Sequence, residues 1–84
     1  MRLDKFLKVS RLIKRRTIAK EVAENKRIMI NDKIAKPSSN VNVDDILKIS
    51  FGNKLVTIKV NALLNSSKKE DAQNMYEIIN EERF

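Results

Sequence analysis

The spacing of the apolar residues changes once along this chain, and that change limits the folds open to it. Up to Ala23 apolar side chains recur every three or four positions, as on one side of a helix. From Ile28 they alternate with polar side chains, as in a strand with one buried face. The pattern predicts a short helix over residues 2 to about 9, then a second helix with Thr17 as its N-cap that ends near Asn25. Two helices followed by a small, mostly antiparallel sheet make an α+β fold.

Two hairpins are expected in the alternating region. The first spans residues 27 to 36, with Asn31-Asp32 at its turn, because both residue types tolerate turn conformations. The second spans residues 45 to 60, with Gly52-Asn53 as a two-residue turn. Its register pairs Leu47 with Ile58. One face of this hairpin is therefore apolar and is formed by Leu47, Ile49, Phe51, Val56 and Ile58.

A third helix is expected near the C-terminus. Ser67 and Glu70 have the spacing of a capping box, and apolar residues follow at helical intervals as far as Ile79. We therefore expect a helix from about residue 68 to 80, packed on or near a domain formed by residues 1–60. The acidic residues of this segment are a candidate divalent-ion site, but a solvated helix face explains them better; they are Glu70, Asp71, Glu77, Glu81 and Glu82.

The composition excludes several classes of function. The chain has 84 residues and contains neither Cys nor His, so it has no thiolate or imidazole metal ligands, no disulfides and no Ser-His or Cys-His catalysis. A domain of this size has a modest core and little room for a deep substrate pocket. Its apolar runs are too short to span a bilayer. We expect a soluble, cytoplasmic monomer that binds no cofactor and is not an enzyme.

The charge is strongly asymmetric. Residues 1–36 carry 12 Lys and Arg against four Asp and Glu, whereas residues 37–84 carry six against seven. Within residues 2–20 eight basic residues face one acid, Asp4. Basic side chains near the start of the second helix, where backbone N–H groups also favour anions, make a plausible phosphate-binding group: Arg15, Arg16, Thr17 and Lys20. A polyanion is the expected partner.

Two residues in this region have alternative interpretations. Asp4 is either the partner of Lys8 one helical turn later, or it orients a neighbouring Arg or accepts a hydrogen bond from a base or ribose. Thr17 is either a helix cap or an RNA contact, and the cap is the simpler interpretation. The basic run at residues 14–16 would alone be read as a solvated loop.

Four segments carry a recognisable pattern: Arg2-Leu3-Asp4-Lys5-Phe6-Leu7, Arg15-Arg16-Thr17-Ile18-Ala19-Lys20, Arg27-Ile28-Met29-Ile30-Asn31 and Val43-Asp44-Asp45-Ile46-Leu47. They resemble the RNA-binding domain named after small-subunit ribosomal protein S-four and cover about the first 50 residues. The remainder, above all residues 51–57 and 68–76, looks like the stand-alone RqcP (YabO) proteins of Gram-positive bacteria. That family is similar to the heat-shock protein that binds large ribosomal subunits carrying peptidyl-tRNA.

The resemblance implies a role in ribosome-associated quality control. Members bind the obstructed large subunit with RqcH, contact ribosomal RNA and peptidyl-tRNA, and support addition of a C-terminal alanine tail to the stalled chain. Carried over by position, the RNA-facing residues are Arg2, Asp4, Lys5, Lys8, Arg11, Lys14, Arg15, Arg16, Thr17 and Lys20.

The sequence departs from the family in its glycines. Where the family usually has Gly after the second helix, in the first hairpin turn and before the third strand, this chain has Lys26 (or Asn25), Asp32 and Asp44. Asn and Asp adopt positive φ at some cost, so the turn geometry is open.

Other functions are also compatible with the sequence. This RNA-binding domain is also an appendage of pseudouridine synthases and tyrosyl-tRNA synthetases, but 84 residues leave no room for their catalytic domains. Two short helices joined by a basic segment can also mimic a DNA-binding helix-turn-helix. A general RNA-binding stress or ribosome-recycling protein without a role in tailing is the main alternative.

Overall fold

A computed structural model describes residues 1–65 and 68–83 of the chain. It contains three helices and five strands in the described residues. In chain order these are α1 (Leu3–Val9), α2 (Arg16–Glu24), β1 (Ile28–Ile30), β2 (Lys33–Ile34), β3 (Ile46–Phe51), β4 (Lys54–Val60), α3 (Lys69–Gln73) and β5 (Tyr76–Arg83). The predicted α+β class is confirmed, although the C-terminal part differs from the prediction.

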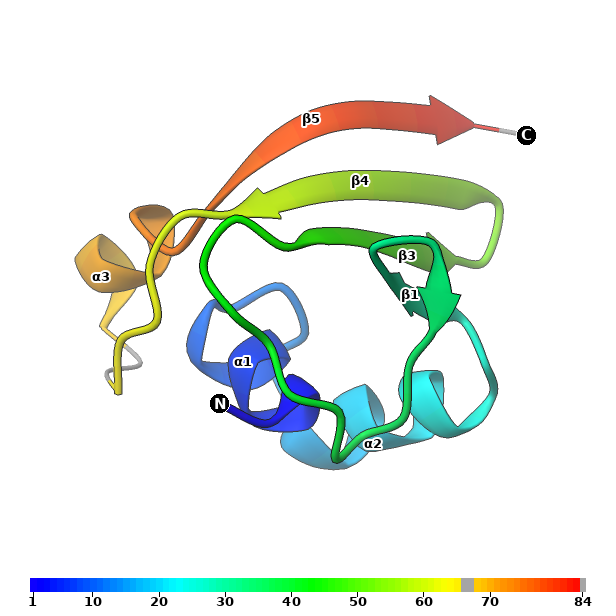
Figure 1. Ribbon diagram of the computed structural model, residues 1–84, viewed down its shortest axis with the longest axis horizontal. Coiled ribbons are helices and arrows are strands. Elements are labelled where there is room, and N and C mark those ends of the chain that lie inside the picture. The colour runs from blue at the N-terminus through cyan, green and yellow to red at the C-terminus, as the bar shows by residue number, and fades with distance from the viewer. Residues whose placement is uncertain (66–67, 84) are drawn as a thin grey trace.

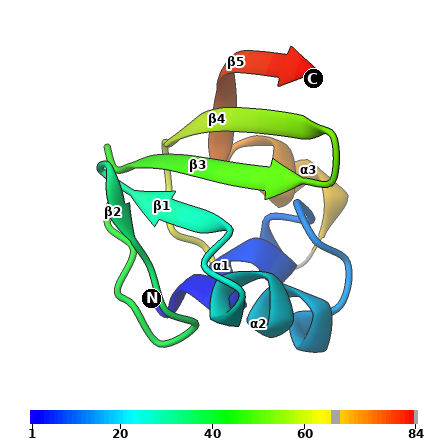
Figure 2. The ribbon, with the colours of Figure 1, turned by 90° about the vertical axis from the view of Figure 1, so that its right-hand side faces the viewer.

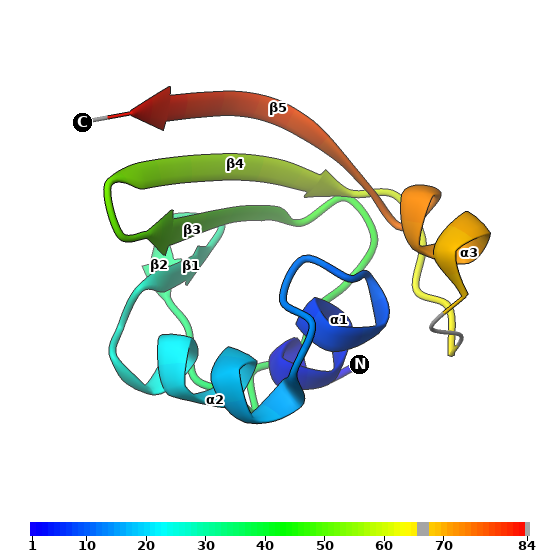
Figure 3. The same ribbon diagram turned by 180° about the vertical axis from the view of Figure 1, so that it is seen from behind.

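The five strands form one antiparallel sheet in the order β2-β1-β3-β4-β5. Helices α1 and α2 lie on the same side of this sheet, as Figure 1 and the view from behind in Figure 3 both show. Figure 2 shows β2 and β5 at the two edges of the sheet. The fold therefore has two layers, and the helical layer contains the basic N-terminal segment.

The core lies between the two helices and the sheet. Helix α1 contributes Leu3, Phe6 and Leu7, which are completely buried, whereas α2 contributes chiefly Ala19 and Ala23. Burial of each Leu or Phe side chain stabilises the fold by about 1.5 to 3 kcal/mol. Because α2 buries only small residues on one narrow stripe, most of its surface faces solvent and is free to present charged side chains.

The long hairpin forms as predicted. Leu47 pairs with Ile58 and Ile49 pairs with Val56, and all four are buried. Gly52 takes a φ of 53° at the turn, a conformation that costs glycine little because it has no Cβ. Phe51, the last member of the predicted apolar face, is only partly buried and packs at the margin of the core.

The positions without the family's glycines do adopt left-handed backbone. The φ angles are 59° at Lys26, 68° at Asp32 and 74° at Asp44. Asn25 itself has a φ of −81°, so Lys26 is the residue that takes the glycine's conformation after α2. Asn31, at 49°, joins Asp32 in the first hairpin turn, and two consecutive positive φ values are typical of a type I′ turn.

The predicted C-terminal helix is present, but its predicted extent of residues 68–80 is wrong. Helix α3 ends at Gln73, and the residues after Met75 form β5, which pairs with β4 along its whole length. Met75 is buried in the core at the turn between α3 and β5. Its carbonyl accepts hydrogen bonds from the Asn61 and Ala62 amides at 2.8 and 3.3 Å. A strand forms here because its backbone hydrogen bonds satisfy the N–H and C=O groups on the outer edge of β4. Ser67, the predicted cap, lies outside the described residues.

The acidic residues near the C-terminus are therefore not one helix face. Glu77, Glu81 and Glu82 are exposed on β5, and Glu81 pairs with Lys54 on β4 at 2.7 Å. Among the described residues, no three acidic side chains are grouped so as to hold a metal ion. No helix in that part of the chain is long and apolar enough to cross a membrane. That residues 1–60 form a domain separate from the extension stays a prediction.

Candidate nucleic-acid interface

The first 20 residues place their basic side chains on the outside of the helical layer. Arg2 precedes α1, two lysines lie on α1, and Arg11 and Lys14 lie in the connecting loop. Arg15 and Arg16 lie at the start of α2, and Lys20 lies in its middle. Of the ten candidate residues, Asp4 is buried and Lys5 half-buried, whereas eight are exposed: Arg2, Lys8, Arg11, Lys14, Arg15, Arg16, Thr17 and Lys20. The structure thus brings the predicted cations to one layer and sets the single acid among them beneath the surface.

Asp4 is the centre of this group. Its Oδ1 accepts hydrogen bonds from Arg2 Nε at 3.2 Å, from the Lys5 amide at 2.8 Å and from Arg16 Nη2 at 3.4 Å, and its Oδ2 accepts one from Arg2 Nη2 at 3.2 Å. The two arginines come from different elements, since Arg2 precedes α1 and Arg16 begins α2. One carboxylate therefore fixes two guanidinium groups side by side.

The environment keeps Asp4 charged. Burial, with only 3% of the residue exposed, would by itself raise the pKa of its carboxyl. The hydrogen bonds from Arg2 and the Lys5 amide, together with the charge of Arg16, outweigh that effect and lower the pKa below its ordinary value of 3.8. The side chains of Arg2 and Arg16 remain 53% and 49% exposed, so each offers further N–H donors to a ligand.

These contacts decide between the two interpretations of Asp4. Its ion pairs in the described residues are with Arg2 and Arg16, and none joins it to Lys8. Asp4 is buried and contacts both guanidinium groups, so it orients the two arginines and is not itself exposed to a ligand. Guanidinium groups held in fixed positions are well suited to bind phosphate oxygens, and less conformational entropy is lost on binding.

The backbone around Arg2 is fixed by a loop far away in the sequence. The Leu3 amide donates to the Ser39 carbonyl at 2.8 Å, and the Asp4 amide donates to the Pro37 carbonyl at 3.1 Å. Arg2 also forms an isolated antiparallel bridge with Asn40. This contribution of residues 37–40 was not predictable from the sequence, because nothing in a short polar loop indicates which helix end its carbonyls will meet.

Helix α2 begins two residues earlier than predicted. Arg16 is its first residue and Arg15 its N-cap, so the prediction of Thr17 as the cap is wrong; Thr17 is an exposed residue of the first turn. Among the described residues no side-chain hydrogen bond caps this end of α2, and its first turn contains no acid. The positive end of the helix dipole therefore adds to the charges of Arg15 and Arg16 instead of being neutralised.

The other basic residues of this segment form few ion pairs with acids of the described residues. Lys20 lies 4.0 Å from Glu24 one turn later on α2. In the parts of the chain that the structure describes, no ion pair involves Lys8, Lys14 or Arg15. Their charges are thus available to a polyanion, which is the property expected of a surface that binds nucleic-acid backbone.

The family model described as the S4 domain matches residues 1–47, the part that contains the whole interface. A protein of Bacillus subtilis named RQC P-site tRNA stabilizing factor is 63% identical over 84 residues, covering 100% of this chain and 98% of its own length. A Streptococcus pneumoniae protein of the same name is 59% identical over 99% of this chain and 94% of its own. The chain belongs to this S4-domain family.

A more distant relative and a solved structure agree with this assignment. A heat shock protein 15 homolog of Haemophilus influenzae is 37% identical over 78 residues, which are 92% of this chain and 60% of that protein. The structure of Vibrio cholerae heat shock protein 15, described as trimeric, superposes with a TM-score of 0.86 at 28% identity over 93% of this chain and 80% of that chain. The predicted resemblance to RqcP and to the heat-shock protein is confirmed.

All ten candidate residues of this S4-domain protein lie inside the matched segment. What the sequence did not indicate is the pairing of Asp4 with Arg16, 12 residues later. Asp4 is the only acid in residues 1–20, which makes a basic partner for it expected but does not identify Arg16 as that partner. A lone acid in a basic segment is more informative than its helical spacing to Lys8.

Proposed function

We propose that this protein binds large ribosomal subunits obstructed by peptidyl-tRNA and stabilises the tRNA in the P site during ribosome-associated quality control. The observation that carries the proposal is the near full-length identity of 54 to 63% to five proteins named RQC P-site tRNA stabilizing factor. The Arg2–Asp4–Arg16 cluster supports it, because such a cluster holds fixed cations where an RNA backbone can meet them.

The protein acts by binding, without catalysis and without a cofactor. The cations of residues 2–20 hold the phosphates of ribosomal RNA and of the tRNA, and the N-terminus of α2 adds its dipole. Holding the tRNA in one arrangement raises the fraction of subunits that are ready for the next RqcH-dependent addition of alanine. The protein has the role of a ligand that shifts a population, and the chemistry belongs to its partners.

The partners follow from the same proposal. They are the ribosomal RNA of the large subunit, the peptidyl-tRNA, and RqcH on the obstructed subunit, and the protein acts as a monomer in the cytoplasm. The ten candidate residues form the RNA-facing surface. Nine of them meet RNA, while Asp4 acts from below by orienting Arg2 and Arg16.

The first experiment measures which particles the protein binds. Large subunits carrying peptidyl-tRNA, empty large subunits and whole ribosomes are sedimented with the purified protein, and the bound fraction is compared. We expect preferential binding to the subunits with peptidyl-tRNA. Equal binding to empty subunits would contradict the proposal, even if the protein binds RNA well.

A second experiment measures tailing in a reconstituted system with RqcH, alanyl-tRNA and obstructed large subunits. Stimulation by the protein should saturate with subunit occupancy and be lost in an Arg2→Ala, Arg16→Ala double variant, and excess variant should partly restore it. The protein alone should hydrolyse no nucleotide and transfer no peptide. Full stimulation by a variant that no longer sediments with the subunit would refute the mechanism.

A general RNA-binding stress or ribosome-recycling role without tailing is the second candidate. It is favoured by the likeness of the fold to heat shock protein 15, at a TM-score of 0.86. In that case the protein would bind subunits with peptidyl-tRNA but leave the length of the alanine tail unchanged. Competition of a bound RNA hairpin by duplex DNA at physiological salt separates both candidates from a DNA-binding protein.

A further inference from the structure

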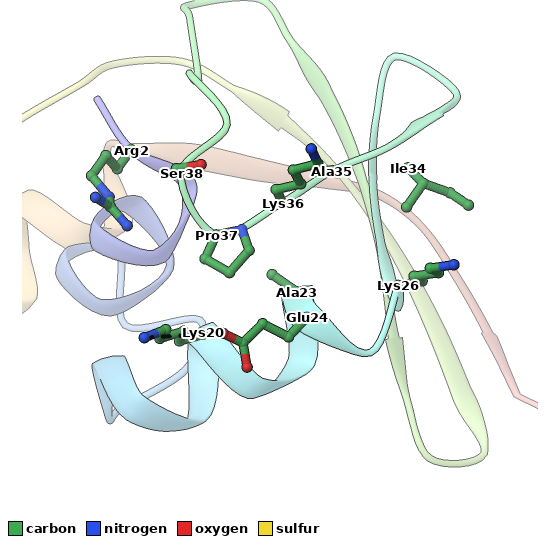
Figure 4. A pocket seen from close by; sticks show the side chains of 10 residues that line it. All are labelled: Arg2, Lys20, Ala23, Glu24, Lys26, Ile34, Ala35, Lys36, Pro37 and Ser38. Atoms are coloured by element: carbon green, nitrogen blue, oxygen red, sulfur yellow. Dashed lines mark ion pairs between the residues drawn. The ribbon is translucent and has the colours of Figure 1, made fainter.

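A cleft of about 490 Å³ lies beside the interface, between the C-terminal half of α2 and residues 34–38, which are the end of β2 and the loop after it. Its apolar lining comes from Ala23, Ile34, Ala35 and Pro37. In Figure 4 Ala23 and Pro37 lie in the middle, Arg2 and Lys20 lie toward one end, and Ile34 and Lys26 lie toward the other. The volume is within the range of about 300 to 1,000 Å³ that is typical of small-molecule sites.

The charges around the cleft favour an anion. Four cations line it, namely Arg2, Lys20, Lys26 and Lys36, against one acid, Glu24. Glu24 lies 4.0 Å from Lys20, which still leaves three lining cations without that neighbour. In the described residues no ion pair involves Lys26 or Lys36, and the side chain of Arg2 remains 53% exposed although it pairs with Asp4. A ligand with a negative charge is therefore attracted to the rim.

The apolar wall is accessible. Ile34 is 60% exposed, more than any other large apolar side chain of the described residues. A single exposed Ile is ordinary on a protein surface, but this one lines a cleft with three further apolar residues and a cationic rim. An apolar body joined to an anionic group fits that combination, and a nucleotide has this chemistry.

Arg2 connects the cleft to the interface. The same guanidinium that lines one end of the cleft is held by Asp4 next to Arg16. A phosphate backbone bound across Arg2 and Arg16 therefore passes the mouth of the cleft. A base that is not paired is free to turn away from that backbone into the cleft, whereas a paired base is not.

We propose that this cleft receives one unpaired nucleotide of the RNA bound at the interface. Its base lies against Ile34 and Pro37, and its phosphate is held by Arg2 and Lys20. The proposal rests on the proposed function, since it requires RNA on the neighbouring surface, and it adds a preference for RNA with an unpaired residue. None of the described residues that line the cleft is aromatic, so the base is held by apolar contact and shape.

The test uses two RNA hairpins that differ only in one unpaired adenine inserted in the stem. The full-length protein should bind the bulged hairpin about fivefold more tightly than the fully paired one, at the low end of the gain from a base stacked on an aromatic ring. With 2-aminopurine in place of the unpaired adenine, binding should change its fluorescence, because its stacking on the neighbouring bases is lost.

Ile34→Ala should abolish the fivefold preference and the fluorescence change while leaving affinity for the paired hairpin unchanged. The matched control is Ile79→Ala, since Ile79 is 54% exposed but lies on β5 away from the cleft. It should keep the preference. Equal binding of the two hairpins by the unaltered protein, or an undiminished preference in Ile34→Ala, overturns the proposal while RNA binding stands. Failure of the unaltered protein to bind either hairpin overturns it together with the proposed function.

Discussion

Asp4 Oδ1 and Arg16 Nη2 lie 3.4 Å apart, although the residues are separated by 12 positions and belong to different helices. The same carboxylate also holds Arg2 at 3.2 Å. This contact joins α1 to α2 at the surface, outside the apolar core. It also holds Arg2 and Arg16 in fixed positions beside each other. A conservative substitution of Asp4 should therefore change the affinity of the basic surface for RNA.

Asp4→Asn should weaken RNA binding by about 1 kcal/mol, although it raises the net charge of the protein. The amide keeps the shape of the carboxylate but loses the charge that orients Arg2 and Arg16. Affinity for an RNA hairpin at physiological salt is the measurement. Asp44→Asn makes the same change in net charge at an exposed acid, 3.6 Å from Lys59, and should bind as tightly as the unaltered protein. Equal affinity of the two variants would contradict the orienting role of Asp4.

The same carboxylate should make stability depend on acid pH. Burial would raise the pKa of Asp4, but the bonds from Arg2 and the Lys5 amide and the charge of Arg16 lower it below 3.8. A group whose pKa is lower in the folded state stabilises the fold above its unfolded pKa, and that contribution disappears as the pH falls through the folded value. Urea unfolding from about pH 6 to about pH 2 measures it.

Asp4→Asn is the control for this titration, because it removes the titrating group. The unaltered protein should exceed the variant in unfolding free energy above about pH 4, and the difference should shrink below it. A difference that is independent of pH would mean that the charge of Asp4 contributes nothing to stability.

Arg16→Ala should weaken RNA binding by about 1.5 to 3 kcal/mol if Arg16 makes a charge-assisted hydrogen bond to phosphate. Its side chain is 49% exposed, but the variant also removes a hydrogen bond to the buried Asp4 carboxylate, so the unfolding free energy should fall by about 1 kcal/mol. Lys59→Ala removes a charge on the outer face of the long hairpin, and this variant should have nearly the same RNA affinity and unfolding free energy as the unaltered protein. RNA affinity that Arg16→Ala leaves unchanged would remove Arg16 from the interface.

Salt should weaken binding steeply, because the candidate interface is mostly Arg and Lys. If about five phosphates are neutralised, the logarithm of the association constant should fall with the logarithm of the salt concentration at a slope of roughly −4, by analogy with duplex DNA. A titration of hairpin binding from low to physiological salt gives the slope. A nearly flat dependence would point to base contacts in place of backbone contacts.

The two helices and the long hairpin were predictable because their signals are local. Leu3, Phe6 and Leu7 mark one helix face, and Gly52 marks a turn whose register follows from alternating apolar residues. Strand β5 was not predictable from the sequence. A longer helix with this apolar spacing would bury Met75, and so does the observed turn into a strand. Only the need of β4 for a partner along its outer edge decides between them, and that need is a property of the assembled sheet.

The candidate interface also combines features that have local sequence signals with a contact that depends on the assembled fold. Its cations were predictable from charge and from the family pattern, because each is a property of one position. The start of α2 was misplaced by two residues, since Thr17 has the chemistry of a cap but the helix begins at Arg16. The contact between Asp4 and Arg16 depends on how α1 packs against α2, which no local signal encodes.

Asp44→Gly should stabilise the protein by up to about 1 kcal/mol. Asp44 has a φ of 74°, and this left-handed conformation costs an L-residue about 1 kcal/mol or more, whereas it costs glycine little. The variant loses the pair between Asp44 and Lys59, but that pair is exposed and contributes about 1 kcal/mol at most. Urea unfolding at neutral pH measures the change.

Glu21→Gly is the matched control, since Glu21 is an exposed residue inside α2 with helical backbone. There glycine should destabilise the protein by about 1 kcal/mol, because the helix gains nothing from its conformational freedom. The two substitutions thus introduce the same residue but should change the unfolding free energy in opposite directions. If Asp44→Gly destabilises the protein as much as Glu21→Gly does, the positive φ at Asp44 carries no cost, and the family's glycine at this position must serve another purpose.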